Sequence, residues 1–85
     1  HESLDVVPTI VDLRNKMESI AQAELKKTLQ TSKISEQEAE AIYKMADSFI
    51  NKILHDPTLF LKQNGMREDK SFYIDTVRKL FKLDE

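Results

Sequence analysis

The chain has 85 residues, 40% of them hydrophobic and 33% charged, and its formal net charge is −2 at pH 7. This composition indicates one globular domain, and a single glycine, two prolines and no strand-like alternation favour an all-α fold. The absence of cysteine excludes disulfides, thiolate metal sites and cysteine nucleophiles. Because the longest unbroken apolar runs, such as Leu59–Leu61, have only three residues, a transmembrane helix or signal-peptide core is also excluded.

The first predicted helix runs from about Pro8 to Thr31. A proline at the first helical position loses no hydrogen bond, because that amide has no partner inside the helix. The alternative is a helix that arrives from upstream and bends at Pro8, whose ring clashes with the preceding turn. Apolar residues recur every three or four positions, as one buried helix face requires; they are Ile10, Leu13, Met17, Ile20, Ala21, Leu25 and Leu29.

The second predicted helix opens with the sequence Ser35-Glu36-Gln37-Glu38. This is the pattern of a capping box, in which the Ser35 hydroxyl accepts from the Glu38 amide and the Glu38 carboxylate accepts from the Ser35 amide. The acidic first turn also suits the positive end of the helix dipole, a role favoured over that of a catalytic carboxylate pair. A wide apolar face follows, formed by Ile42, Met45, Ala46, Phe49, Ile50, Ile53 and Leu54.

The Asp56-Pro57 pair interrupts this helical pattern. Pro57 either kinks the second helix or starts a short helix over residues 57–63 with Asp56 as its N-cap, and the Asp-Pro pair favours the second arrangement. Gly65, the only glycine, is then expected to end the short helix in a left-handed turn.

A C-terminal helix completes the expected fold. It is predicted over residues 70–83, after a polar linker over residues 66–70, with Asp69 or Ser71 as its N-cap. Its apolar residues are Phe72, Tyr73, Val77, Leu80 and Phe81. The expected fold is therefore an elongated all-α bundle of two long helices plus one short and one C-terminal helix.

His55 is the only histidine after the first residue. No second histidine or cysteine stands at ligand spacing, so a metal site lacks ligands. In the last turn of the second helix, the imidazole is expected instead to bond carbonyls that a helix end leaves without partners. Because one glycine supplies neither a phosphate loop nor a dinucleotide fingerprint, no catalytic, cofactor or metal site is predicted within the chain.

Two clusters of basic residues stand near predicted helix ends. They are Lys26-Lys27 with Lys33, and Arg78-Lys79 with Lys82. Acidic residues lie near each cluster and the charges of the chain are balanced, which favours a solvated surface. Contact with phosphate groups is the alternative.

The apolar faces of the two long helices are wider than one helix contact needs. Each spans about half of the helix circumference, and the shorter C-terminal helix cannot cover both. Exposed apolar surface on this scale usually marks an interface, and a second copy related by a two-fold axis would bury it, although a three-helix monomer needs wide faces too. The residues expected at a dimer interface are Ile10, Leu13, Met17, Ile20, Leu25, Met45, Phe49 and Ile53.

Several motifs of the chain have the order and spacing of a known family. They are Asn51-Lys52-Ile53-Leu54-His55-Asp56-Pro57-Thr58, preceded by Val7-Pro8-Thr9-Ile10, Leu13-Arg14, Glu24-Leu25 and Ser35-Glu36. With these motifs the chain resembles the C-terminal dimerisation domain of glutamyl-tRNA reductase, over nearly its whole length from Val6 to Leu83.

The resemblance implies that residues 1–85 are a single helical dimerisation domain, a fragment of a longer reductase. That enzyme is expected to be cytoplasmic and NADPH-dependent, and to convert glutamyl-tRNA to glutamate-1-semialdehyde in the first step of tetrapyrrole and haem biosynthesis. The expected partners are a second copy of the chain and, for the parent enzyme, tRNA(Glu). The fragment itself is expected to be non-catalytic, with no cofactor, metal or membrane contact.

Two other functions stay open from the sequence. A helical domain that contacts tRNA predicts an affinity that falls steeply with salt. A free-standing helical regulator predicts heteromers with an amphipathic partner. A homodimerisation module predicts instead a melting temperature that rises with protein concentration.

Overall fold

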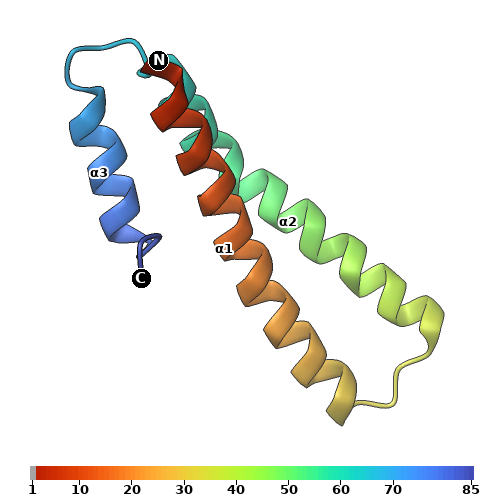
Figure 1. Cartoon of the computed structure of the whole chain (residues 1–85). Coiled ribbons are helices and arrows are strands. Elements are labelled where there is room, and N and C mark those ends of the chain that lie inside the picture. Colours follow the sequence, from red (N-terminus) through yellow and green to blue (C-terminus); the bar gives the residue numbers. More distant parts are fainter. Residues whose placement is uncertain (1) are drawn as a thin grey trace.

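The chain folds into three helices, α1 (Glu2–Thr31), α2 (Glu36–Gln63) and α3 (Lys70–Leu80). A computed structural model describes the backbone of residues 2–85 and the side chains from Val6 onward. The two long helices form an antiparallel hairpin, and α3 lies beside the N-terminal half of α1 (Figure 1). The predicted all-α fold is confirmed.

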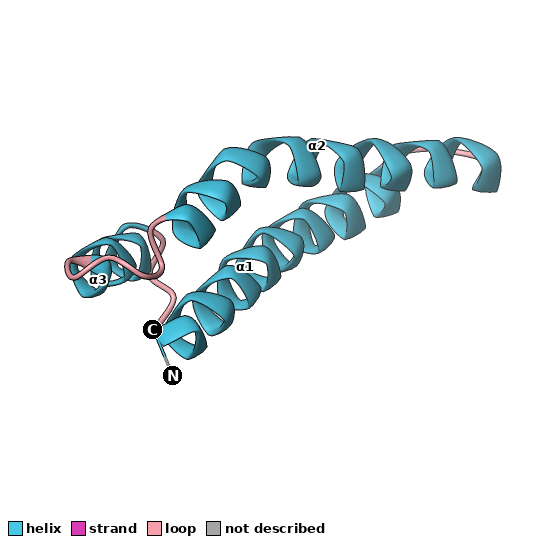
Figure 2. Ribbon diagram, turned by 90° about the horizontal axis from the view of Figure 1, so that it is seen from above, coloured by secondary structure: helices cyan, strands magenta, loops and turns pink. Residues whose placement is uncertain are grey.

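The molecule is elongated, as its helix lengths predict. Its extents are 52 × 23 × 17 Å and its radius of gyration is 15.9 Å, against about 12 Å for a compact domain of this length. At 1.5 Å per residue the 11 residues of α3 reach about 17 Å, whereas the 30 residues of α1 reach about 45 Å. Figure 2 shows α3 at one end of the hairpin, so the other end lacks a third helix.

The first helix does not begin at Pro8. It begins at Glu2 and contains Pro8, so the predicted start at the proline is wrong and the helix precedes Pro8, as the alternative had it. The bend that the alternative places at Pro8 stays a prediction. On either side of the proline, Val6 and Thr9 are buried. The packing of this turn outweighs the hydrogen bond that the proline removes.

The loop between the long helices ends in the predicted capping box. The Ser35 Oγ accepts from the Glu38 amide at 3.1 Å, and the Ser35 amide donates to the Glu38 Oε1 at 3.0 Å. Bonding to the Ser35 amide, and then to its hydroxyl, lowers the pKa of the Glu38 carboxyl below its ordinary value. The role predicted for both residues is confirmed.

The second helix continues through Pro57, so the predicted short helix with Asp56 as its N-cap is wrong. The reason is burial on both sides of the proline. Leu54 and Leu61 stand seven residues apart, two turns along one helix face, and both are buried. Breaking the helix at Pro57 would move one of them out of the core, a loss comparable with the roughly 3 kcal/mol that an internal proline costs.

Gly65 follows the helix but does not adopt the predicted left-handed conformation. Asn64 is the C-cap, and its Nδ2 donates to the Phe60 carbonyl at 2.8 Å. Gly65 is buried where the chain passes α1: a Cβ there would lie 3.0 Å from Val6 Cγ2 and 3.3 Å from the Leu61 carbonyl oxygen. The glycine is needed for close packing rather than for its backbone freedom.

The last helix ends earlier than predicted, at Leu80 instead of Leu83. Lys82 takes the left-handed conformation, with φ of 52°, and its amide donates to the Lys79 carbonyl. The Leu83 amide donates to the Arg78 carbonyl at 3.0 Å, and together these bonds form a Schellman motif. At the other end Asp69 is the N-cap, as one of the two alternatives had it, but its side chain accepts from Arg67 rather than from a helix amide.

A small core joins the three helices. Its buried centre is formed by Leu13 of α1 with Ile50 and Leu54 of α2. The side chains packed around this centre are Met17, Ala21, Val77, Phe81 and Leu83. The residues that the C-terminal part of the chain contributes to this cluster come from the second half of α3 and the turn that follows it.

Candidate functional site

The residues predicted at an interface fall into two groups. Leu13 is buried within the chain, and Ile10, Met17 and Leu25 are half-buried. The others are exposed over half or more of their surface: Ile20 by 51%, Met45 by 66%, Phe49 by 64% and Ile53 by 50%. We call these four residues the open stripe.

The open stripe continues the face of the hairpin that α3 covers at one end. On α2, Ile53 stands seven residues before Phe60, on the same helix face, and the Phe60 ring meets Tyr73 of α3 edge-on at 5.0 Å. On α1, Ile20 stands three turns after Thr9, and the Thr9 hydroxyl accepts from Arg78 of α3 at 3.1 Å. One apolar face is therefore covered by α3 near the chain termini and open beyond it.

The α1 and α2 parts of the open stripe stand at the same level of the hairpin. The Arg14 Nη1 donates to the Asn51 Oδ1 at 2.8 Å, which sets the level of one antiparallel helix against the other. Six residues further along α1 is Ile20, and six residues back along α2 is Met45. At equal rise per residue these side chains stand at the same level of the hairpin.

Two exposed residues of α3, one aromatic and one aliphatic, are not among the interface residues predicted from the sequence. Phe72 and Leu80, 67% and 72% exposed, are about two turns apart on one flank of α3, with Thr76 on the turn between them. The sequence pattern identifies both only as apolar residues of the last helix. Thr76 stands four residues from each of them, and this polar residue interrupts the apolar pattern. That interruption is the signal in the sequence that this flank of the helix is exposed.

Arg78 fixes the position of α3 at the edge of the open stripe. Its guanidinium donates at 2.7 Å to the Asp12 Oδ2 of α1 and at 2.7 Å to the Asp84 Oδ1 of the C-terminal turn. These bonds, first that of Asp84 and then that of Asp12, raise the pKa of Arg78, and Arg78 lowers the pKa of the Asp84 carboxyl. Only 19% of the Arg78 side chain is exposed, against 40% for Arg14, 56% for Arg67 and 78% for Lys79 in their ion pairs.

Both predicted basic clusters contain lysines that face carboxylates. Lys27 lies 3.4 Å from Glu24, and Lys79 lies 3.0 Å from Asp75. With Arg78 held by two aspartates, these surfaces favour the solvated interpretation of the clusters over phosphate contact.

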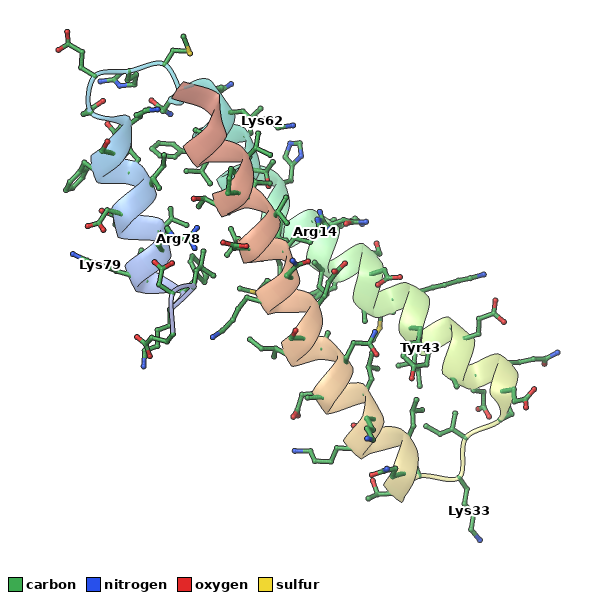
Figure 3. All side chains as sticks on the ribbon, viewed as in Figure 1. Arg14, Lys33, Tyr43, Lys62, Arg78 and Lys79 are labelled. Atoms are coloured by element: carbon green, nitrogen blue, oxygen red, sulfur yellow. The ribbon has the colours of Figure 1, made fainter. Side chains whose placement is uncertain are left out.

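His55 does not lie at a helix end, because α2 continues past it to Gln63, and the role predicted for it at orphan carbonyls is wrong. It lines a hollow of about 250 Å³ between α1 and α2, together with Arg14 and Lys62. Figure 3 shows the Arg14 and Lys62 side chains along the seam of the two helices. Asn51 bonds across to Arg14 rather than back to its own helix.

Two classes of structural feature are absent from the described part of the chain. Among the side chains from Val6 onward, no three or more from His, Cys, Asp or Glu are grouped so that they could hold a metal ion. None of the three helices is long and apolar enough to cross a membrane. The open stripe, an exposed apolar surface, is therefore the candidate functional site of the described residues.

Known proteins resemble this chain over nearly its whole length. Residues 1–83 match the family described as glutamyl-tRNAGlu reductase, dimerisation domain. A glutamyl-tRNA reductase of Desulfatibacillum aliphaticivorans is 46% identical over 85 residues, which cover 98% of this chain and 20% of that protein. One of Syntrophobacter fumaroxidans is 42% identical over 82 residues, covering 95% of this chain and 18% of that protein.

A third glutamyl-tRNA reductase, of Trichlorobacter lovleyi, is 41% identical over 83 residues, covering 96% of this chain and 19% of that protein. The chain thus spans about a fifth of the length of these relatives. No solved structure is significantly similar to it.

Proposed function

The chain belongs to the family of glutamyl-tRNA reductase dimerisation domains, and from this premise we propose that it joins two reductase subunits by covering the open stripe with a second copy of itself. The observation that carries the proposal is the apolar face that α3 covers at one end and leaves exposed over Ile20, Met45, Phe49 and Ile53. A homodimer supplies a self-complementary partner for such a face.

The size of the interface follows from the energy that the stripe can supply. Four half-exposed apolar side chains on each of two copies contribute about 1 kcal/mol each, or roughly 8 kcal/mol in total. Association costs about 4–15 kcal/mol in lost translational and rotational freedom. The stripe alone is therefore marginal, and the interface includes further apolar surface, for which Phe72 and Leu80 of α3 are two of the exposed candidates.

The relatives are named glutamyl-tRNA reductases, and this name together with the resemblance of the sequence motifs to that family supports a proposal for the whole protein. Its subunits carry out an NADPH-dependent reduction of glutamyl-tRNA to glutamate-1-semialdehyde in the cytoplasm, with tRNA(Glu) as the nucleic-acid part of the substrate. The present chain contributes no catalytic residue to that reaction. Its task is to hold two subunits in one molecule.

A charged residue in the open stripe tests this function. Phe49→Glu places an unpaired carboxylate in the interface and should weaken association by roughly 100-fold, or about 3 kcal/mol, without unfolding the monomer in which Phe49 is exposed. The matched control is Gln22→Glu, which adds the same charge on α1, about 200° around the helix from Ile20. Sedimentation equilibrium measures both, and equal association of the two variants would contradict the proposal.

A further inference from the structure

The hollow between α1 and α2 has the chemistry of an anion site. Its lining includes the guanidinium of Arg14, the imidazole of His55, the hydroxyl of Thr58 and the ammonium of Lys62. No carboxylate belongs to the lining. Elsewhere on the described surface, Arg67, Arg78 and Lys79 each lie within 3.0 Å of an aspartate.

Arg14 is already oriented for a ligand. Its Nη1 donates to the Asn51 Oδ1 at 2.8 Å, so one edge of the guanidinium is fixed against α2. The same Nη1 also forms a long ion pair of 4.0 Å with the Glu18 Oε2, and Glu18 lies outside the lining of the hollow. Since the Asn51 Oδ1 accepts this bond, its Nδ2 is the atom that can donate to a ligand.

The remaining polar groups follow along α2 in one direction. His55, Thr58 and Lys62 succeed Asn51 at intervals of three or four residues, so they share one helix face. Lys62 carries the second formal charge of the hollow, about 16 Å along the helix from Asn51. Figure 3 shows the labelled Arg14 and Lys62 along the line where α1 and α2 meet.

This polar face is opposite the open stripe. Asn51 follows Phe49, and His55 follows Ile53, by two residues, which is 200° around an α-helix. A second copy that covers the stripe therefore leaves the hollow open. The hollow is independent of the proposed dimer in this respect.

We propose that the Arg14–Lys62 hollow binds a phosphate group. A phosphate group, with a charge of about −1.5 to −2 as a monoester at neutral pH, can bond the Arg14 guanidinium together with the nearby amide and hydroxyl donors. Lys62, at the other end of the hollow, attracts it from a distance. The volume of about 250 Å³ is large enough for a phosphate group together with part of the molecule that carries it. That molecule is either a small phosphate ester or an RNA strand, whose backbone presents the same oxygens.

The test follows backbone and Asn51 side-chain amide signals of the whole 85-residue chain by NMR while inorganic phosphate is added at constant ionic strength. We expect saturable shifts confined to the residues that line the hollow. Arg14→Gln should weaken phosphate binding by about tenfold, the effect of losing one charge-assisted hydrogen bond. Lys62→Gln should weaken it by about fourfold, the effect of removing a positive charge roughly 10 Å away. Lys33→Gln, which removes the same charge in the loop at the far end of the hairpin, should leave it within about twofold.

Lys62→Gln keeps the test decisive if Arg14→Gln unfolds the chain, because the Lys62 side chain is on the exposed surface of α2.

A second arm of the experiment replaces phosphate with a short RNA duplex. Competition between RNA and phosphate identifies an RNA backbone as the source of the group, and saturation by phosphate without RNA binding identifies a small phosphate ester. Shifts that stay linear in phosphate concentration, or an equal loss in Lys33→Gln, would overturn the site. Sedimentation of Lys62→Gln is expected to be unchanged, so failure of the hollow and failure of the dimer are distinguishable.

Discussion

Arg78 of α3 donates a hydrogen bond of 2.7 Å to Asp12 of α1, across 66 residues of sequence. The same guanidinium holds Asp84 of the C-terminal turn, so one side chain joins the last helix, the end of the chain and the first helix. Because α3 covers only part of the apolar face, this contact sets where the covered part ends and the open stripe begins. We treat it as the main polar determinant of α3 docking.

Replacement of Arg78 tests this role. Arg78→Lys keeps the charge but loses the planar fork that reaches Thr9, Asp12 and Asp84 together, and should lower the free energy of unfolding by about 2 kcal/mol. Urea unfolding at fixed protein concentration measures the loss, and hydrogen exchange should show it first in α3. Lys79→Ala, at an exposed pair with Asp75, should change stability by less than about 0.5 kcal/mol. Equal effects of the two changes would contradict the assignment.

The Arg78–Asp84 pair also predicts a pH dependence. Arg78 lowers the pKa of Asp84 from its ordinary value of 3.8, so the folded chain binds this proton less readily than the unfolded chain. The stabilisation is therefore complete above that value and is lost as pH falls through the folded pKa. The difference in unfolding free energy between wild type and Asp84→Asn should be constant near about pH 6 and should shrink as the pH falls below 3.8. A difference that grows on acidification would refute the pair.

Little in the sequence reveals this contact. Arg78 stands beside Lys79 in a basic cluster, and local charge patterning indicates a solvated surface for both. Its partners are set by the docking of α3 on α1, a tertiary arrangement that no periodicity encodes. By contrast, the capping box of Ser35 and Glu38 is local, and its spacing alone was sufficient to predict both hydrogen bonds.

Gly65 gives a prediction about packing rather than backbone conformation. Its φ is not positive, so alanine is conformationally allowed, but the added Cβ would lie 3.0 Å from Val6 Cγ2. Val6 is buried and the nearby Leu61 carbonyl oxygen belongs to a helix, so neither can move freely. Gly65→Ala should lower the unfolding free energy by about 1 kcal/mol, the cost of modest overpacking.

A double-mutant cycle with Val6→Ala separates this clash from other causes. If contact with Val6 dominates, Gly65→Ala should cost clearly less in the Val6→Ala background than in wild type. Thermal unfolding of the four proteins at one concentration supplies the coupling energy. Additive losses would show that the glycine is needed for another reason.

The errors around Pro57 and Gly65 have one physical origin. Proline and glycine are the strongest local signals for an interruption, and both were interpreted as helix boundaries. Burial of Leu54 and Leu61 holds α2 through the proline, and approach of Val6 accounts for the glycine. The exposed part of the apolar face was predicted better, because helix lengths alone indicate that the third helix is too short to cover the other two.

The mass of the wild-type chain in solution tests the central claim most directly. Sedimentation equilibrium from about 1 to about 100 μM spans the range in which a dimer with roughly micromolar affinity assembles. We predict that the mass rises across this series to twice the 9.9 kDa of one chain. A mass that stays at 9.9 kDa up to the highest concentration, with the open stripe intact, would contradict a dimer formed by this chain.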